Sequence, residues 1–368
     1  MATHDDSNYL EVKNLVKVFG NDRAVDDISF SIPRGAFLTL LGPSGCGKTT
    51  TLMSIAGLHA IDGGSIRVGD VMYTSPAEGL FLAPEKRDIG MVFQSYAIWP
   101  HMTVKQNVAY PLEIRKVAKD EIEDRVAQTL ALVGLTDMAE KMATQLSGGQ
   151  QQRASLARAI VSQPLLLLFD EPLSNLDLKL REAMRVELKR IQNEVGITSV
   201  YVTHDQSEAL VMSDEIIVMS KGSIEQRGGP RDIYAHPTNR YVSNFIGVAN
   251  LLDGTVTKAE NGGLGQVAVS HNGAKIDVTC RISDGLAEGA DTVLSVRPEN
   301  VHAIRENQGG NCLEGEVIEA VFLGSYVDCR VKWGDFEWKV IAHPRDRLRK
   351  GEKVFLKLDP DHSLAVRP

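Results

Sequence analysis

The sequence contains no apolar stretch approaching the roughly 18 residues that a membrane-spanning helix needs. Residues Met1 to Leu10 are polar and acidic and lack the apolar core of a secretory signal. We therefore expect no secretory signal. We also expect that any membrane process in which the protein takes part involves a separate membrane partner.

The sequence also contains few cysteines and fewer basic than acidic residues. The four cysteines (Cys46, Cys280, Cys312 and Cys329) form no C-x-x-C pair and no His/Cys zinc spacing, which predicts free thiols, as in a reducing compartment. The 40 basic residues are outnumbered by 48 acidic ones, giving a formal charge of −8 and a pI near 5.7. This balance disfavours nucleic acid as a main partner, because phosphate-backbone binding needs a basic face.

The chain has 43% hydrophobic and 24% charged residues, a composition typical of a globular protein. The length of 368 residues is enough for about two domains. Over the first two-thirds, short apolar runs alternate with helical patterns. Four runs are typical of strands buried on both faces in a parallel sheet, namely 37–41, 165–169, 199–203 and 216–219.

Two amphipathic stretches between these runs predict helices. In residues 121–133, the side chains of Ile122, Val126, Leu130 and Val133 share one helical face. Residues 178–195 form the second stretch, which Gly196 is placed to end. Strands alternating with helices predict an α/β domain over residues 1–240.

After about residue 240 the pattern changes to short β-type runs. His236-Pro237 and the segment to Asn250 are predicted to form a connection. Strand-like runs follow at 292–296, 326–331, 338–341 and 354–358, and Asn261-Gly262-Gly263 and Asn272-Gly273 are turn signals. Residues 252–256 and 313–317 share the pattern Leu-acid-Gly-x-Val, which fits either a faint repeat or chance. We predict a smaller all-β domain over 241–368.

Residues Gly42-Pro43-Ser44-Gly45-Cys46-Gly47-Lys48-Thr49 fit the G-x-x-x-x-G-K-[ST] pattern of a phosphate-binding loop. The loop follows the predicted strand 37–41 and precedes a helical stretch from Thr50 to Ala56. Glycines let backbone N–H groups converge on phosphate oxygens, and a helix N-terminus adds positive potential. We expect Lys48 to reach the β- and γ-phosphates and Thr49 to hold Mg²⁺. Cys46 is predicted to be a small spacer, although a helix N-terminus lowers a thiol pKa.

Two acids, Asp170 and Glu171, directly follow the apolar run 165–169. Such a strand delivers carboxylates to the carboxyl edge of the sheet, where open α/β sheets bind ligands. Asp170 is predicted to hold Mg²⁺ and Glu171 to activate the attacking water. An acidic turn after a core strand is the plainer alternative, which the neighbouring phosphate loop disfavours.

Further motifs resemble those of ABC ATPases. Leu146-Ser147-Gly148-Gly149-Gln150 matches the LSGGQ signature and precedes the Asp170 strand, as in that family. Gln94 is similar to the Q-loop glutamine, Asp177 in Ser174–Asp177 to the D-loop aspartate, and His204 to the switch histidine. Phe19 occupies the position where the family stacks an aromatic ring on adenine. The resemblance covers residues 9–240, with all motifs in order.

The resemblance implies a role for each of these residues. Ser147 and Gly149 of one subunit would clamp the γ-phosphate of ATP bound by a partner subunit, in a head-to-tail homodimer or a dimer with a paralogous ATPase. Gln94 would help to hold Mg²⁺ and His204 would support Glu171. Core packing of Phe19 and simple helix capping by Asp177 are the alternatives, and for Asp177 the two roles can coexist.

The resemblance also narrows the class to importer ATPases that serve sugars, polyamines, iron(III), sulfate and phosphonates. It implies ATP and Mg²⁺ as cofactors, a helical subdomain over about 95–160, and an OB-like (TOBE) C-terminal region that acts as a dimer brace or a ligand sensor. The partners would be membrane permease subunits and, indirectly, a solute-binding protein, at the cytoplasmic face of the inner membrane. Ile98, Trp99 and Met102 would be exposed there to the permease, or packed within the subdomain.

The residues from Gln94 to Val104 and those at 250–254 are most similar to those of polyamine and iron(III) importer ATPases, and this resemblance favours one of these solutes. Two other classes remain open from the sequence. One is a soluble ABC-type ATPase that remodels a protein or nucleic-acid complex. The other is a non-catalytic regulator that uses ATP as a dimer switch, which the presence of Glu171 and His204 disfavours.

Overall fold

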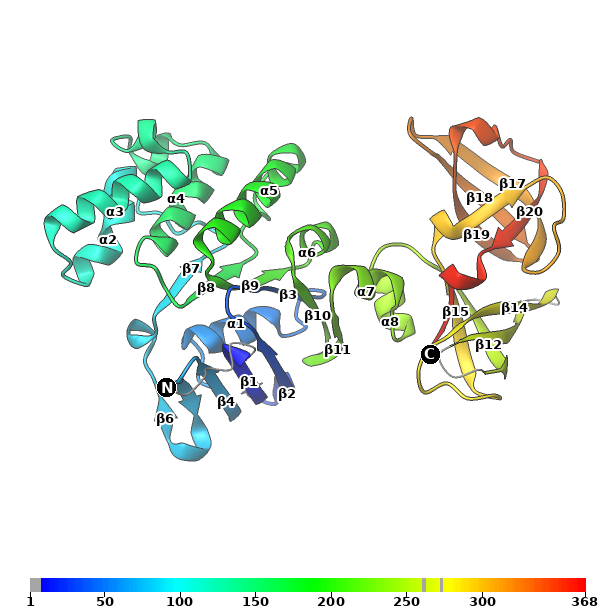
Figure 1. The fold of residues 1–368 in the computed structure, drawn as a ribbon, viewed down its shortest axis with the longest axis horizontal. Helices are drawn as coiled ribbons and strands as arrows, with labels where there is room; N and C mark the ends of the chain where they lie inside the picture. Colours follow the sequence, from blue (N-terminus) through cyan, green and yellow to red (C-terminus); the bar gives the residue numbers. More distant parts are fainter. Residues whose placement is uncertain (1–7, 260–262, 272–273) are drawn as a thin grey trace. The chain divides into compact units, whose positions relative to one another are not determined.

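The computed structural model describes residues 8–259, 263–271 and 274–368, and the chain divides into two compact units between Pro230 and Arg231 (Figure 1). The division lies before the boundary predicted at 240. The turn signal Asn272-Gly273 and most of Asn261-Gly262-Gly263 fall outside the described residues. None of the helices in the described part of the chain has the length and apolarity needed to span a bilayer.

The first unit contains a six-stranded sheet of order β11-β10-β3-β9-β8-β7, in which only the β10–β11 pair is antiparallel. Its strands are β3 (Phe37–Leu41), β7 (Ile89–Val92), β8 (Leu166–Asp170), β9 (Thr198–Thr203), β10 (Glu215–Ser220) and β11 (Ser223–Gly228). The four predicted strands are therefore confirmed to within one or two residues at their ends. Their side chains are almost entirely buried, as both-face burial of a parallel sheet requires.

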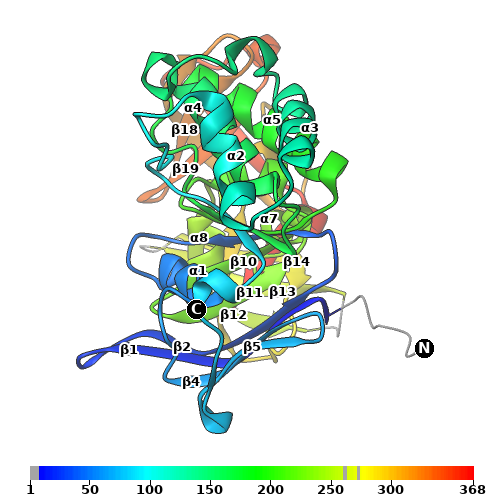
Figure 2. The same ribbon diagram turned by 90° about the vertical axis from the view of Figure 1, so that its left-hand side faces the viewer.

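A second sheet in this unit is antiparallel, with strand order β2-β1-β4-β5-β6. Its strands are β1 (Leu10–Phe19), β2 (Asp22–Ile32), β4 (Gly63–Val68), β5 (Val71–Ser75) and β6 (Leu80–Phe81). We did not predict these strands from the sequence. Helix α1 (Lys48–Ala56) lies between the two sheets, because one apolar core joins Leu52 and Ile55 to residues of β1, β3 and β9 (Figure 2).

The other face of the six-stranded sheet packs against the remaining long helices. Phe37, Phe169 and Tyr201 share a core with side chains of α2 (Val104–Ile114), α3 (Lys119–Leu132), α4 (Gly148–Ile160) and α5 (Leu178–Val195). The short helix α6 (Gln206–Met212) follows β9. The predicted helix 178–195 has the observed bounds, and Gly196 ends it with a left-handed φ of 68°.

The second unit begins with two short helices, α7 (Pro230–Ala235) and α8 (Arg240–Phe245). The predicted connection over 236–250 is therefore wrong, because it includes α8. The Asn239 side chain caps α8 by accepting a hydrogen bond of 2.8 Å from the N–H of Val242. The buried Arg297 ties both helices to the β region by donating to the carbonyl oxygens of Tyr234, Ser243, Ile246 and Val248.

The rest of this unit is all β, as predicted. One part is a closed barrel of order β12-β13-β14-β21-β15, built from Asn250–Lys258, Leu264–His271, Ala274–Ile282, Ser363–Val366 and Asp291–Val296. The other is a sheet of order β16-β20-β17-β18-β19, built from Val301–Ile304, Lys353–Leu358, Cys312–Phe322, Val327–Trp333 and Phe336–Ala342. Both contribute to one apolar core.

The shared Leu-acid-Gly-x-Val pattern has a common physical setting in these two parts. Gly254 of β12 and Gly315 of β17 each lie against the adjacent strand. A Cβ at Gly254 would be 2.8 Å from the carbonyl oxygen of Ala268, and one at Gly315 would be 2.8 Å from that of Lys332. Each position therefore requires glycine for the same steric reason.

Candidate functional site

The phosphate loop lies at the carboxyl end of β3 and leads into α1, which begins at Lys48. Gly47 has a φ of 103°, and a Cβ there would be 2.5 Å from the carbonyl oxygen of Ala24. Only glycine fits this conformation and this close approach. The loop thus leads directly into the first turn of α1, whose N–H groups have no partner within the helix, as an anion site requires.

Lys48 is folded back along this loop. Its side chain is buried, and its Nζ donates to the carbonyl oxygens of Gly42 at 2.7 Å and Pro43 at 2.9 Å. A pocket of about 220 Å³ opens here and is lined by Ala24, Ser44, Gly45, Gly47, Lys48, Thr49, Thr50 and Glu171. Two predicted elements, the loop and the water-activating acid, therefore share one cavity.

Cys46 differs from the expectation for a thiol at a helix N-terminus. Burial raises its pKa, and this outweighs the opposing effect of Lys48, whose Nζ lies 3.8 Å from the Cys46 sulfur. The expected lowering of the thiol pKa is therefore wrong, because the side chain is only 3% exposed. All four cysteines are free thiols.

The predicted Mg²⁺ residues Thr49 and Asp170 are adjacent. The Thr49 hydroxyl donates to Asp170 Oδ1 at 3.0 Å, across the gap between α1 and the end of β8. Burial raises the pKa of Asp170, and the nearby Glu171 carboxylate raises it further. Paired oxygen donors beside a phosphate site suit Mg²⁺, which is held by few protein ligands together with nucleotide phosphates. The described residues contain no cluster of three His, Cys, Asp or Glu that would suit a different metal.

Glu171 and His204 face each other across the ends of β8 and β9. The His204 Nδ1 lies 2.9 Å from Glu171 Oε2, and the two strands are neighbours in the sheet. Glu171 has a left-handed φ of 44°, which is costly for a residue with a side chain. Its N–H donates to the carbonyl oxygen of Val202 at 3.0 Å, and Ser174 donates twice to its carbonyl oxygen. These bonds hold the strained backbone in place.

The histidine is followed by a charged network that its neighbours in the sequence do not predict, because it joins Asp205 to the distant Arg185. Asp205 caps α6 through the N–H groups of Ser207 and Glu208, and it pairs with Arg185 at 2.8 Å. Burial raises the pKa of Asp205, but these hydrogen bonds and Arg185 outweigh burial, so that the net shift is downward. The network attaches the turn that carries His204 to helix α5.

Phe19 lies at the tip of the β1–β2 hairpin and is 47% exposed, so it is not a core residue. Lys17 Nζ lies 5.0 Å from the centre of its ring, and the His59 ring packs against it at 5.5 Å between centroids. An exposed aromatic ring held in this way is suited to stack on a flat heterocycle.

The Ser147–Gln150 segment forms the start of α4 and does not line the phosphate-loop pocket. Ser147 is exposed at the N-cap, and its own N–H donates to the Gln150 side chain at 2.9 Å. Gly148 lies against Leu176, just before α5, and Gly149 lies against Leu180 in the first turn of α5; a Cβ would be 3.3 Å and 3.0 Å from these side chains. Asp177 caps α5 by accepting from the N–H of Leu180 at 3.0 Å.

Gln94 is exposed, and its carbonyl oxygen accepts a 2.9 Å hydrogen bond from the Asn175 side chain. In the described part of the chain, no hydrogen bond joins the Gln94 side chain to Thr49 or Asp170. The following apolar residues are half-buried rather than exposed. Ile98 packs against the core, and Trp99 packs on Tyr110 and Arg158.

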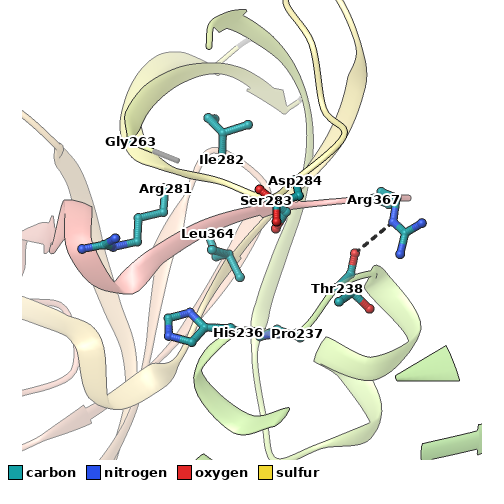
Figure 3. Close-up of a pocket in the computed structure, with 10 residues that line it drawn as sticks. All are labelled: His236, Pro237, Thr238, Gly263, Arg281, Ile282, Ser283, Asp284, Leu364 and Arg367. Carbon is teal, nitrogen blue, oxygen red and sulfur yellow. Dashed lines mark hydrogen bonds between the residues drawn. The ribbon is translucent and has the colours of Figure 1, made fainter. Parts of the chain in front are cut away.

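Two larger cavities, of about 580 and 390 Å³, lie in the second unit and share His236, Pro237, Arg281 and Leu364. Figure 3 shows the smaller one between the 236–238 segment and the barrel. Arg281 is paired with Asp361 at 2.8 Å. The charged lining of the two cavities is balanced, with three arginines against three acids: Arg281, Arg297, Arg367, Asp284, Glu299 and Asp361. None of the predicted site residues lines either of these two cavities.

Comparisons with known proteins agree with this geometry. The sequence profile described as ABC transporter matches residues 25–174, and that of the TOBE domain matches 294–366. The chain is 42% identical to the spermidine/putrescine import ATP-binding protein PotA of Clostridium acetobutylicum, over 96% of this chain and 94% of that protein. It is 47% identical to PotA of Chromobacterium violaceum, over 87% and 84%.

The chain is also similar to a relative named for a different solute and to a protein of known structure. Identity to the trehalose/maltose import ATP-binding protein MalK of Thermococcus litoralis is 42%, over 93% of each chain. The solved structure of cbiO1 from Clostridium perfringens, described as part of the ABC transporter complex cbiONQ, has 28% identity and a TM-score of 0.57. That match covers 62% of this chain and 92% of cbiO1.

Proposed function

Because the chain belongs to the import ATP-binding proteins of the ABC transporter family, we propose that it drives solute uptake by hydrolysing ATP at the site formed by Lys48, Glu171 and His204. The observation that carries this proposal is the Glu171–His204 contact of 2.9 Å beside the phosphate loop. The relatives described above are named as import or transport proteins. None is named for remodelling a protein or nucleic-acid complex.

In this proposal the phosphate loop and the N-terminus of α1 bind the ATP phosphates, and Phe19 stacks on the adenine. Lys48 would leave its two carbonyl partners to contact the β- and γ-phosphates. Thr49 and Asp170 would hold Mg²⁺, which when bound neutralises phosphate charge. Gln94 would need to turn toward this pair to contribute.

Glu171 would accept a proton from the attacking water as the bond between the γ-phosphorus and the bridging oxygen breaks, leaving ADP and phosphate. His204 would orient the Glu171 carboxylate through the contact at Nδ1 and would lie against the γ-phosphate with its other ring nitrogen. The charged network at Asp205 keeps this histidine in place.

We further propose a head-to-tail dimer. Ser147 is exposed at a helix N-terminus and does not line the phosphate-loop pocket of its own chain. A second copy, or a paralogous ATPase, would place Ser147 and Gly149 on the γ-phosphate. Membrane permease subunits would then receive the motion at the surface around Gln94, at the cytoplasmic face of the membrane, and a solute-binding protein would act through them.

Replacement of Glu171 by Gln tests both the assignment of Glu171 as the base and the proposed ATP-dependent dimer. Glu171→Gln keeps the shape of the side chain but removes the base, so steady-state phosphate release should fall about 10²–10⁴-fold. ATP binding should persist, and gel filtration with ATP and Mg²⁺ should show a stable dimer. Lys48→Ala is the control, since it should lose ATP retention and the dimer together. Hydrolysis by Glu171→Gln at the wild-type rate would refute the assignment of the base.

For the solute, we propose a polyamine, since several relatives are named for spermidine and putrescine. The equal identity to a trehalose/maltose relative makes a disaccharide the competing solute. Uptake of labelled putrescine and maltose should be measured in cells that lack this chain and carry it back as wild type or Lys48→Ala. Restored maltose uptake without restored putrescine uptake would reverse the assignment.

A further inference from the structure

A short loop after α1, residues 57–62, is attached to the strand that carries Phe19. The N–H of Asp62 donates to the carbonyl oxygen of Val16 at 2.8 Å, and Asp62 Oδ2 accepts from the N–H of Val18 at 2.7 Å. The same carboxylate pairs with Lys17 at 3.1 Å. Three contacts from Asp62 therefore hold this loop against the end of strand β1, next to Phe19.

His59 adds a contact with the ring itself. The two ring planes are nearly perpendicular, at 82°, with centroids 5.5 Å apart, which is the favoured edge-to-face arrangement. His59 is half-buried, whereas Phe19 is 47% exposed. An exposed ring at a hairpin tip would otherwise sample several rotamers.

The loop also connects this ring to the phosphate site through one rigid element. Helix α1 begins at Lys48, ends at Ala56 and has nine residues, so it spans roughly 14 Å. Gly57 ends it in a left-handed conformation, and the backbone N–H groups of Leu58 and His59 both donate to the carbonyl oxygen of Met53. The ring and the phosphate loop are thus attached to opposite ends of the same helix.

We propose that His59, supported by Asp62, is a positioning residue for the nucleobase: its edge contact fixes the Phe19 ring so that the open part of the ring meets a purine whose phosphates lie at the start of α1. This inference rests on the proposed function of Phe19 as the stacking residue. His59 acts through Phe19, so its removal should weaken binding of a base-containing nucleotide and leave the phosphate site intact.

The experiment compares His59→Ala with Leu58→Ala, in which an exposed neighbour on the same loop is shortened. An edge-to-face pair is lost only in His59→Ala, so KM for ATP should rise about 2–10-fold with little change in kcat. Inorganic triphosphate, which has no base, should inhibit both variants as well as it inhibits the wild type. His59→Phe, which restores an aromatic edge, should return KM close to the wild-type value.

Phe19→Ala distinguishes failure of the stacking role of Phe19 from failure of the positioning role of His59. If Phe19→Ala leaves KM for ATP unchanged, the stacking role itself fails and this inference fails with it. If Phe19→Ala raises KM but His59→Ala behaves like Leu58→Ala, only the role of His59 is overturned. Equal weakening of ATP and triphosphate by His59→Ala would also overturn it, because the phosphate loop would then have been disturbed.

Discussion

Replacement of Arg87 by alanine should destabilise the first unit strongly. Arg87 is 3% exposed and lies just before β7. Burial lowers its pKa to about 10, so the guanidinium remains charged at neutral pH. Its hydrogen bonds, from 2.6 to 3.3 Å, go to the carbonyl oxygens of Ser54, Ile55, Tyr73 and Leu82 and to the hydroxyl of Thr74.

The size of the effect follows from the carbonyl groups left behind. Ile55 lies in the last turn of α1, and its carbonyl oxygen would be left buried without this partner, at about 1–3 kcal/mol, whereas the Ser54 carbonyl oxygen would keep the N–H of Gly57 at 3.1 Å. Loss of the other hydrogen bonds from the charged guanidinium adds to this cost and relief of the buried charge offsets part of it, so we expect a net loss of about 2–4 kcal/mol. For a unit of this size, that corresponds to a fall in Tm of roughly 5–15 °C.

Scanning calorimetry of the full chain is the assay, because the transition of the first unit can be followed beside that of the second. Arg125→Ala is the matched control, since Arg125 makes a surface i,i+4 pair with Glu121 worth about 0.5 kcal/mol or less. Arg87→Lys should recover little, because an ammonium cannot reproduce the forked donors. A Tm for Arg87→Ala within about 2 °C of the wild type would refute this reasoning.

Two further predictions concern titration. Burial raises the pKa of Glu208, so the folded chain keeps this proton to higher pH than the unfolded chain; the resulting stability is present below about pH 4 and is lost as pH rises through the raised pKa. Glu208→Gln should flatten that part of a Tm–pH curve, and parallel curves would contradict the prediction. Iodoacetamide at neutral pH should label the half-buried Cys312 first, because burial raises the pKa of Cys280 to about 12 and of Cys329 to about 11. Peptide mass spectrometry would show the order, and early labelling of Cys280 would contradict it.

The antiparallel sheet of the first unit shows one limit of sequence analysis. Its strands alternate buried and exposed residues only in part, because β1 has several register shifts in its pairing with β2 and one in its pairing with β4. Leu10 pairs with Val68, far along the chain. Such pairing depends on the whole unit and leaves no clean two-residue period to recognise.

Short helices and thiol reactivity show a second limit. Helix α8 has six residues, too few to form without its Asn239 cap and its contacts with Arg297. Cys46 lies beside a helix N-terminus, which lowers a thiol pKa, but burial reverses the direction. Neither burial nor a tertiary hydrogen bond can be read from neighbouring residues alone.

What the sequence by itself determined are features encoded within a few consecutive residues. The phosphate loop, the strand ending in Asp170-Glu171 and the 178–195 helix needed only local spacing, because each depends on backbone conformation or on a short apolar period. Only the tertiary structure decided which distant groups meet. Glu171 contacts His204, and Thr49 contacts Asp170, because β3, β9 and β8 are neighbours in one parallel sheet whose carboxyl ends share an edge.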